Sequence, residues 1–434
     1  MTDSWWSSTE AAAVPAGRRV RGRATPPPSK SLTHRCFNAA LLAARPTFVE
    51  RPLEAEDTAL FLAALARLGC RVERGREGVA IDPSAALPAG GELFCGNAGT
   101  MLRLLVASLA TRSGHWRVDG VARLRERPVG PLVDSLRALG ARIDYLGEPG
   151  FAPLAVHGAT LDGGSTRLDA AQSSQYLSAL LMAATRARRA VEIVVQGLVS
   201  APYVELTLDL LARQGARIER PAEHRFRVTP GELAGGRLAV EPDLSAAAYP
   251  AAAAALTGGE ILLAGVSLAS RQGDRRLLEI LAAMGARVEP TPAGVRVAGG
   301  ALVAFDGDLA DIPDQVPTLA ALAPFARGTT RIRNVAHLRL KESDRLAAMA
   351  EELKRAGAAV EELADGLVIP GVWATARPPE EPVTVDPHGD HRIAMARALV
   401  GLRRPGLRVA EPGCVAKSYP TFWRELAGWL GEPS

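Results

Sequence analysis

The sequence contains few cysteines, few aromatic residues and little net charge, and each shortage argues against a class of protein. Its four cysteines, Cys36, Cys70, Cys95 and Cys414, lie far apart and form no Cys-x-x-Cys pair. This spacing argues against a zinc site or a disulfide framework and indicates a reducing compartment. Aromatic residues make up only 5% of the chain, and 51 Lys and Arg residues barely exceed 47 Asp and Glu residues. A nucleic-acid-binding module is therefore disfavoured, and the small basic excess fits local anion pockets better.

Long apolar runs and targeting signals are also missing. The Ala-rich run 246–256 contains Pro250 and is shorter than the roughly 20 residues that cross a bilayer. The N-terminal stretch MTDSWWSSTEAAAVPAG lacks the basic start and apolar core of a signal peptide. No Gly-rich phosphate loop of a nucleotide-binding protein occurs between a strand and a helix. We therefore expect a soluble cytoplasmic protein that binds no membrane and no nucleic acid.

What is present is an internal repeat. Five segments share the pattern Leu-x-x-x-Gly followed by a β-branched residue, and their glycines, 70 to 75 residues apart, are Gly69, Gly140, Gly215, Gly285 and Gly357. Each segment predicts an amphipathic helix that ends at a C′ glycine and is followed by a strand. A spacing near 72 fits about six α/β units into 434 residues. This length also predicts two or more domains.

A second set of six segments alternates with the first. These segments open on small or polar residues and then turn strongly apolar, over residues 31–43, 96–110, 173–184, 244–256, 315–326 and 391–402. Helices that are apolar nearly all round are expected to be buried in a core. If their starts converge, the positive ends of their dipoles favour an anion. Those starts hold Ser31, Asn97 to Thr100, Ser173, Ser174, Ser245, Asp314 and His391, and a linker between halves is expected near residues 240–243.

Three of these starts carry groups suited to an anion. In CGNAGTMLR, residues 95–103, the backbone N–H groups of a Gly-rich turn precede a helix, although an ordinary tight turn explains the same residues. In PPPSKSLTHR the prolines are expected to prevent a helix from starting before Ser31. Lys30, Ser31 and Arg35 could then bind a phosphate or carboxylate. Alternatively, Ser31 caps a surface helix and the two basic residues are solvated. Ser173, Ser174 and Gln175 form a neutral phosphate cradle or another helix cap.

Charged residues mark two further stretches in the C-terminal half. LKESDR places Lys341 and Arg345 four residues apart on one helical face with Glu342 between them, or it is a solvated helix start. Asp314 precedes an apolar helix, where a helix cap is the simpler explanation. The HGDHR stretch, residues 388–392, invites a metal site, but no further Cys or His supplies a matching ligand set. We therefore expect no metal.

Taken in order, the motifs resemble those of 5-enolpyruvylshikimate-3-phosphate (EPSP) synthases. They are PSKSLTHR, LFCGNAGTMLRLL, RERPVG, SSQYLSALLMAA, SAPYVELT, IPDQVPTLAALAPFARGTT, RLKESDRLAAMAEELKRAGA, GDHRIAMA and CVAKSYPTFW, and they span residues 28–423. The resemblance implies the α/β fold of enolpyruvyl transferases, a two-domain inside-out α/β barrel. Each domain would hold three βαβαββ repeats around buried helices. Residues 28–242 would form one domain, residues 1–27 and 243–434 the other, and the active site would lie in the cleft between them.

The resemblance also implies an activity. The enolpyruvyl (1-carboxyvinyl) group of phosphoenolpyruvate would move to the 5-hydroxyl of 3-phosphoshikimate, with release of phosphate, in the shikimate pathway of aromatic amino-acid biosynthesis. Neither a metal nor an organic cofactor would be needed, and the chain would act as a monomer on small-molecule substrates.

The residues for this reaction carry over position by position. The implied 3-phosphoshikimate site is Lys30, Ser31, Arg35, Ser173, Ser174, Gln175, Ser200, Tyr203, Asp314 and Lys341. The implied phosphoenolpyruvate site is Lys30, Gly99, Arg127, Gln175, Arg345, Arg392 and Lys417. Asp314 would accept the 5-hydroxyl proton, Glu342 and Lys30 would move protons at the methylene carbon and the leaving phosphate, and His391 would support them. The chemistry agrees, since two substrates with about five negative charges between them need many cations nearby.

Two alternatives stay open on the sequence. UDP-N-acetylglucosamine enolpyruvyl transferases share the fold but typically carry a cysteine near the position of residues 123–127, where this chain has none. A non-catalytic anion-binding relative would not need Asp314 and Glu342 among the cations. Two positions depart from the family pattern: His337 stands where many members have Asn, and Leu104 replaces a frequent Pro.

Overall fold

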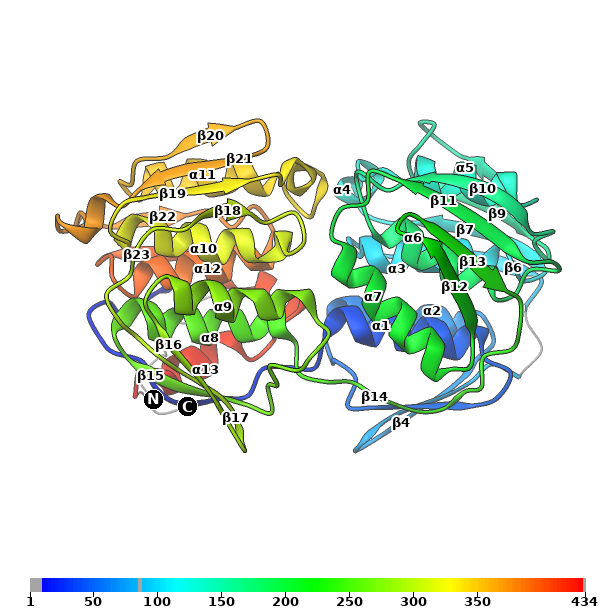
Figure 1. The fold of residues 1–434 in the computed structure, drawn as a ribbon, viewed down its shortest axis with the longest axis horizontal. Coiled ribbons are helices and arrows are strands. Elements are labelled where there is room, and N and C mark those ends of the chain that lie inside the picture. Colours follow the sequence, from blue (N-terminus) through cyan, green and yellow to red (C-terminus); the bar gives the residue numbers. More distant parts are fainter. Residues whose placement is uncertain (1–9, 85–87, 432–434) are drawn as a thin grey trace. The chain divides into compact units, whose positions relative to one another are not determined.

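The chain folds into two compact units of mixed α/β structure. The computed structural model describes residues 10–84 and 88–431. One unit runs from Pro28 to Glu241, and the other joins the chain up to Pro27 to the chain from Pro242 on. In Figure 1 each unit shows sheets on its outside and helices within.

The 28–241 unit contains three four-stranded sheets of the same design. In strand order they are β14 (Gly236–Ala239), β3 (Thr47–Glu50), β5 (Gly78–Asp82) and β4 (Arg71–Gly75); β6 (Gly90–Phe94), β7 (Gly114–Asp119), β9 (Leu154–Gly158) and β8 (Arg142–Tyr145); and β10 (Gly164–Asp169), β11 (Val191–Gln196), β13 (Arg225–Thr229) and β12 (Arg217–Ala222). Each sheet opens with a parallel pair and continues antiparallel. The helices are α1 (Lys30–Leu42), α2 (Glu56–Arg67), α3 (Gly99–Leu109), α4 (Ala122–Arg125), α5 (Gly130–Ala138), α6 (Gln175–Ala184) and α7 (Ala201–Arg213).

The other unit repeats this design with one variation. Its sheets are β2 (Arg21–Ala24), β15 (Glu260–Ala264), β17 (Gly294–Ala298) and β16 (Arg287–Thr291); β18 (Asp306–Asp308), β19 (Thr329–Arg333), β21 (Gly366–Pro370) and β20 (Glu361–Leu363); and β22 (Val383–Val385), β23 (Leu407–Ala410) and β1 (Ala11–Ala13). The N-terminal strands β1 and β2 pair with β23 and β15, so the start of the chain completes two sheets of this unit.

Helices of this second unit are of two kinds. The α-helices are α8 (Leu244–Thr257), α9 (Arg276–Ala283), α10 (Val316–Leu322), α11 (Arg345–Arg355), α12 (His391–Gly401) and α13 (Phe422–Trp429). The 3-10 turns are η1 (Gly273–Arg275), η2 (Pro313–Gln315), η3 (Ala323–Phe325), η4 (Ala336–Leu340), η5 (Val372–Ala374) and η6 (Pro412–Lys417). No helix in residues 10–84 and 88–431 is long and apolar enough to cross a membrane.

The repeat read from the sequence is confirmed in both units. Helices α2, α5, α7, α9 and α11 each end just before one of the five repeated glycines. All five glycines have φ between 81° and 110°, the left-handed conformation that ends a helix and that side chains disfavour. A strand follows each glycine: β4, β8, β12, β16 and β20.

The second set of helices forms the core of each unit, as expected. In the 28–241 unit α1, α3 and α6 pack against one another, and in the other unit α8, α10 and α12 do the same. Every residue of α8, α10 and α12 is buried, which explains why these sequences are apolar on all faces. Because the interior of each unit is helical, polar side chains near the starts of these helices are held by tightly packed neighbours.

Candidate active site

The starts of two core helices meet in the 28–241 unit. The Gln175 Nε2 group, at the start of α6, donates to Thr100 Oγ1 in the first turn of α3 at 2.9 Å. Ser173 Oγ accepts from the Gln175 backbone N–H at 3.2 Å. Because these helix ends lie side by side, their unpaired amides and positive dipole ends act on the same space. The arrangement fits the anion site expected from GNAGT and SSQ.

Two buried arginines contact the starts of these two helices. Arg127 Nη1 donates to the Asn97 carbonyl at 3.0 Å, and Arg103 Nη1 donates to Gln175 Oε1 at 2.6 Å. A Cβ atom on Gly99 would lie 2.6 Å from Arg127 Cζ and 2.8 Å from Arg103 Nη1. Glycine at this position therefore makes room for both guanidinium groups. Arg103 was not among the predicted site residues, and its only signal was a single charge inside an apolar helix.

The guanidinium group of Arg35 is hydrogen-bonded to other residues of the protein. It is buried, its Nε donates to Thr207 Oγ1 at 2.7 Å, and its Nη2 donates to Ser178 Oγ at 3.2 Å and to the Tyr203 carbonyl at 2.9 Å. Its Nη1 donates to the Ser31 carbonyl at 2.9 Å. Burial lowers the pKa of Arg35 to about 10. Arg35 therefore joins the segments that carry Ser31 and Tyr203, and its direct contact with a substrate stays a prediction.

Helix α1 begins one residue before the predicted start. Ser29 caps it by accepting from the Leu32 N–H, so Lys30 is already helical, and the expectation that the prolines delay the helix to Ser31 is wrong. Pro at the preceding positions is compatible with this cap because it needs no helical N–H. Lys30 Nζ lies 3.5 Å from Asp57 Oδ2, a buried carboxylate in the first turn of α2. Nothing in the sequence pointed to Asp57.

Ser200 is held in an unusual backbone conformation. It precedes α7 with φ 54° and ψ 42°, the left-handed region, and it is buried. Such conformations cost about 1–3 kcal/mol and persist where the surrounding structure enforces them. Ser200 and Tyr203 thus lie at a rigid helix start, where both were predicted to contact 3-phosphoshikimate.

In the other unit a single arginine joins three carboxylates. Arg345 is buried, and its Nε donates to Asp390 Oδ2 at 2.7 Å, its Nη1 to Asp314 Oδ1 at 2.8 Å and its Nη2 to Glu342 Oε2 at 2.8 Å. Arg392 Nη2 donates to the second Asp314 oxygen at 2.7 Å. Five charged groups from the starts of α11, α12 and η2 therefore form one network. Four of them were predicted site residues, and Asp390 was not.

The network controls the charge of Asp314. Burial by itself would raise the pKa of this carboxyl, but Arg392, Arg345 and Lys341 hold the pKa well below its usual range. The nearby His337 is buried too, and burial, followed by the charge of Lys341, lowers its pKa to about 3. His337 is therefore neutral at pH 7, and it adds no charge beside Asp314 and Lys341.

The helical interpretation of LKESDR is wrong. Helix α11 begins at Arg345, and the preceding residues from Lys341 to Asp344 are not helical. Asp344 caps the helix by accepting from the Ala347 N–H at 3.0 Å, which fixes the start at this point. Lys341 and Arg345 thus share no helical face, and Arg345 meets Glu342 across the helix start instead.

Comparisons with known proteins agree on one family. Residues 14–426 match the family described as EPSP synthase (3-phosphoshikimate 1-carboxyvinyltransferase). The chain belongs to the EPSP synthase family. It is 46% identical over 410 residues to the 3-phosphoshikimate 1-carboxyvinyltransferase of Syntrophobacter fumaroxidans, with 93% of this chain and 96% of that protein covered. The enzyme of that name from Nitrosomonas europaea is 42% identical, with 97% and 99% covered.

Solved structures agree. The EPSP synthase structure from Acinetobacter baumannii matches with a TM-score of 0.79 at 29% identity, covering 97% of this chain and 98% of that one. The predicted two-domain enolpyruvyl transferase fold is confirmed by this match.

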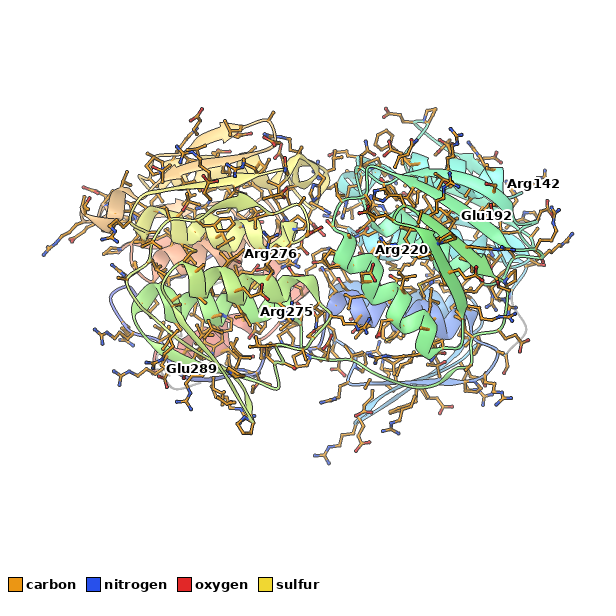
Figure 2. All side chains as sticks on the ribbon, in the orientation of Figure 1. Arg142, Glu192, Arg220, Arg275, Arg276 and Glu289 are labelled. Atoms are coloured by element: carbon orange, nitrogen blue, oxygen red, sulfur yellow. The ribbon has the colours of Figure 1, made fainter. Side chains whose placement is uncertain are left out.

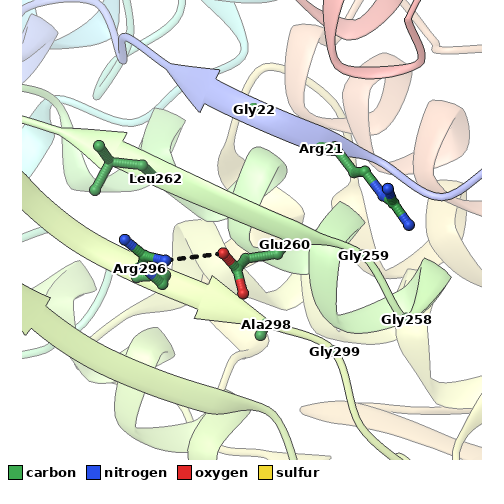
Figure 3. Close-up of a pocket in the computed structure, with 9 residues that line it drawn as sticks. All are labelled: Arg21, Gly22, Gly258, Gly259, Glu260, Leu262, Arg296, Ala298 and Gly299. Carbon is green, nitrogen blue, oxygen red and sulfur yellow. Dashed lines mark hydrogen bonds and ion pairs between the residues drawn. The ribbon is translucent and has the colours of Figure 1, made fainter.

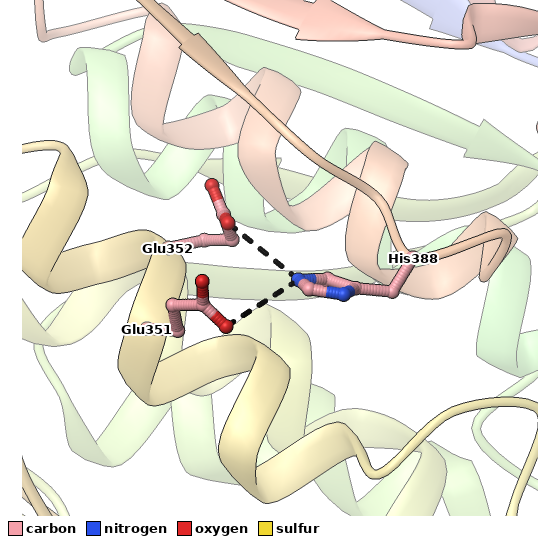
Figure 4. Close-up of side chains that lie close together, drawn as sticks. All are labelled: Glu351, Glu352 and His388. Atoms are coloured by element: carbon pink, nitrogen blue, oxygen red, sulfur yellow. Dashed lines mark ion pairs between the residues drawn. The ribbon is translucent and has the colours of Figure 1, made fainter.

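His391 and Lys417, two further predicted residues of this EPSP synthase family member, are buried. His391 is the first residue of α12, and its Nδ1 lies 3.6 Å from Asp390 Oδ1. Lys417 ends η6 and is buried. In the HGDHR stretch, Asp390 accepts a hydrogen bond from Arg345. His388 instead lies close to the carboxylates of Glu351 and Glu352 (Figure 4).

The cluster of Glu351, Glu352 and His388 is a poor metal site. Its ligand atoms lie within 4.8 Å of one another. However, Arg355 already places Nη2 3.3 Å from Glu351 Oε1 and Nε 3.5 Å from Glu352 Oε1. A metal ion would have to displace this guanidinium, so the cluster is better described as an ion-pair network.

A hollow in the unit that joins the chain up to Pro27 to the chain from Pro242 on lies apart from the predicted residues. It has a volume of about 540 Å³ and lies against the strands β2, β15 and β17 (Figure 3). Arg21, Glu260 and Arg296 supply its charges, and Arg296 Nη1 donates to Glu260 Oε1 at 3.0 Å. None of the residues predicted for catalysis or substrate binding lines it.

Proposed function

We propose that this protein transfers the enolpyruvyl group of phosphoenolpyruvate to the 5-hydroxyl of 3-phosphoshikimate, giving EPSP and phosphate. The relatives that carry the name of this activity match the chain over nearly its whole length. The observation that carries the proposal is the buried network in which Asp314 faces the guanidinium groups of Arg345 and Arg392. Fixed cations around a carboxylate suit a reaction that binds anions and moves a proton.

The network also suggests how Asp314 becomes a base. In the free protein two arginines hold it ionised, and a carboxylate with so low a pKa is a weak proton acceptor. Arg345 and Arg392 are the residues proposed to bind phosphoenolpyruvate, whose negative charges would offset theirs. Binding of the substrate then raises the pKa of Asp314 and makes it accept the hydroxyl proton more readily. Substrate binding and activation of the base are thereby coupled.

The other proposed roles follow from the surroundings of each group. Glu342 lies beside Arg345, and Lys30 lies beside Asp57. Both side chains carry a group that can transfer a proton at the methylene carbon and the leaving phosphate. His391, beside Asp390, supports the network. Arg127, Gln175 and the amide N–H groups at the start of α3 and α6 bind phosphoenolpyruvate.

The 3-phosphoshikimate contacts are proposed from both units. They are Lys30, Ser31, Arg35, Ser173, Ser174, Gln175, Ser200 and Tyr203 in one unit and Lys341 with Asp314 in the other. Neither unit alone holds every residue proposed for the reaction. We also propose that one chain suffices, without a metal or organic cofactor; a single monomeric peak in light scattering that retains full activity would support this.

The test is phosphate release from phosphoenolpyruvate. Release should depend on added 3-phosphoshikimate, and it should be lost in Lys30→Ala. UDP-N-acetylglucosamine, the acceptor of the alternative transferase, should not replace 3-phosphoshikimate, since residues 123–127 contain no cysteine. Phosphate release at equal rates with either acceptor, or with neither, would contradict the proposal.

A second prediction concerns Gly99. In Gly99→Ala the new Cβ would overlap the guanidinium groups of Arg127 and Arg103, which must move because real contacts at 2.6 Å do not occur. We expect the KM for phosphoenolpyruvate to rise about tenfold, the cost of roughly 1.4 kcal/mol of lost binding, while the KM for 3-phosphoshikimate changes less. Steady-state kinetics measures both constants. Gly413→Ala is the control, because nothing lies within 4 Å of its added Cβ.

A further inference from the structure

Two histidines face each other on a sheet of the 28–241 unit. His115 on β7 and His157 on β9 are direct partners in the antiparallel register. Their Nδ1 atoms lie 3.0 Å apart, and the rings are 5.2 Å apart between centroids at 67°. On the far side of His157, Nε2 lies 2.8 Å from Asp144 Oδ2 on β8. None of these three residues is among those proposed for enolpyruvyl transfer.

The carboxylate decides which nitrogen of His157 carries a proton. An ionised Asp144 only accepts, so His157 Nε2 must donate to it. In neutral His157 the lone pair then sits on Nδ1 and points toward His115. His115 Nδ1 donates its own hydrogen into that lone pair. Both Nδ1 atoms can offer a lone pair to an ion once the His115 proton moves through solvent from Nδ1 to Nε2.

This arrangement has the parts of a metal-binding pair. Metal-bound histidines almost always donate their other ring N–H to a carboxylate or carbonyl, as His157 does to Asp144. With metal–nitrogen bonds of about 2.0–2.1 Å, nitrogens 3.0 Å apart subtend an angle of roughly 95° at the ion. This angle is close to that of square-planar or tetragonal Cu(II) and Ni(II), and smaller than the tetrahedral angle that Zn(II) prefers. To bind one ion through both nitrogens, the two rings would rotate out of their mutual hydrogen bond.

The surroundings leave room for the ion and its other ligands. His115 is exposed and His157 is about one-third exposed, so water can complete the coordination. Arg142, the partner of His157 on β8, stands at the outer part of the unit (Figure 2). The next cation along β7, Arg117, is offset by Asp119 at 2.8 Å and Glu92 at 3.4 Å. Asp144 adds a negative charge on β8 two residues from Arg142, so the charged residues on these strands are of both signs.

We propose that His115 and His157, oriented by Asp144, form a surface site for a divalent copper or nickel ion, separate from the enolpyruvyl transfer site. The two histidines are already cross-strand neighbours, so binding requires the His115 proton to move through solvent from Nδ1 to Nε2 and needs no change in the backbone. A bound ion would connect β7 to β9 and stabilise the β6-β7-β9-β8 sheet.

Metal titration of the full, tag-free chain tests this site. Isothermal titration calorimetry with CuCl₂, NiCl₂ and ZnCl₂ should show one high-affinity site per chain. Copper should bind most strongly and zinc most weakly. His115→Gln and His157→Gln should each weaken copper binding at least about 30-fold, and Asp144→Asn about tenfold, the usual effect of losing an orienting carboxylate. His224→Gln changes an exposed histidine in a turn and should leave binding unchanged. Electron paramagnetic resonance of the copper form should show two coupled nitrogens.

Phosphate release serves as the check that the variants fold. All four variants should keep wild-type phosphate release in metal-free buffer, because none of them alters a residue proposed for catalysis. Copper binding in His115→Gln or in His157→Gln that is as tight as in the wild type would overturn the proposal. So would a wild-type affinity no greater than that of a variant carrying both substitutions. A copper spectrum without nitrogen coupling would do the same.

Discussion

Asp314→Asn is expected to lower kcat by about 10²–10⁴-fold, the range by which a positioned general base accelerates a reaction. The amide has nearly the shape of the carboxylate but cannot accept the hydroxyl proton. It also turns N–H donors toward Arg345 and Arg392, which need acceptors at 2.8 and 2.7 Å. Steady-state phosphate release measures the loss, and retention of more than a tenth of wild-type kcat would show that Asp314 is not the base.

The pH profile gives this prediction a second readout. Arg392, Arg345 and Lys341 hold the pKa of Asp314 below its usual range in the free protein, so Asp314 stays ionised well below pH 4. If phosphoenolpyruvate offsets those cations, the carboxylate protonates at higher pH in the complex. The acid limb of kcat should therefore lie at higher pH than the protonation of Asp314 in the free protein, and Asp314→Asn should lack this limb.

An exposed carboxylate serves as the matched control. Asp306 pairs with Arg333 at 2.7 Å in the same unit, but both side chains are about half exposed. Surface pairs of this kind contribute little, so Asp306→Asn should keep kcat within about twofold of wild type. A similar loss in both variants would point to a general effect of charge and not to proton transfer.

The architecture was predictable because its signals are local. Eight residues are enough to encode the end of a helix at a left-handed glycine and the β-branched residue that leads into the next strand. The five repeats all fold this way, at Gly69, Gly140, Gly215, Gly285 and Gly357. Burial of the core helices followed from their lack of a polar face. These features depend on the chain near each residue and little on distant contacts.

The partners of the charged side chains were not predictable in this way. Arg35 donates to Thr207, Ser178 and Tyr203, which lie 143 or more residues away along the chain. Arg103 and Asp57 became visible only through their distances to Gln175 and Lys30. Such contacts depend on how separate repeats pack together, and no local pattern records them. The roles proposed for site residues came from resemblance, which names positions but not their hydrogen-bond partners.

Charge spacing gave a wrong helix start where a capping residue lay within the same segment. Lys341 and Arg345 have the spacing of one helical face. Asp344 between them is also a good helix cap, and in the structure the cap decides the start of α11. The same preference set the start of α1, where Ser29 caps the helix before Ser31. Capping residues are therefore better guides to these starts than charge spacing.

Arg345→Met is expected to destabilise the protein by about 3–5 kcal/mol, the usual cost of breaking a buried ion pair by removing one partner. Arg345 is 1% exposed and joins Asp390, Glu342 and Asp314. After the change, these three carboxylates, which are at most 21% exposed, repel one another, while Asp314 keeps its ion pair with Arg392. Thermal unfolding should begin roughly 10 °C lower.

Its control lies in the same unit. Arg333 pairs with Asp306 at 2.7 Å, and both side chains are about half exposed. Arg333→Met should therefore cost less than about 1 kcal/mol. Arg345→Lys keeps the charge but cannot bridge three carboxylates, so its melting temperature should fall between those of wild type and Arg345→Met. Equal losses in Arg345→Met and Arg333→Met would contradict the central place of Arg345.

The loss in Arg345→Met should also depend on pH, with a definite sign. A carboxyl whose pKa is lowered on folding stabilises the fold above its unfolded pKa, and this stability disappears as the pH falls through the folded pKa. In the wild type the pKa of Asp314 is lowered, so its contribution persists to below pH 4. Without Arg345 the carboxyls protonate more readily, and protonation relieves their repulsion. The difference in melting temperature should therefore be largest near pH 7 and should narrow as the pH falls toward 4.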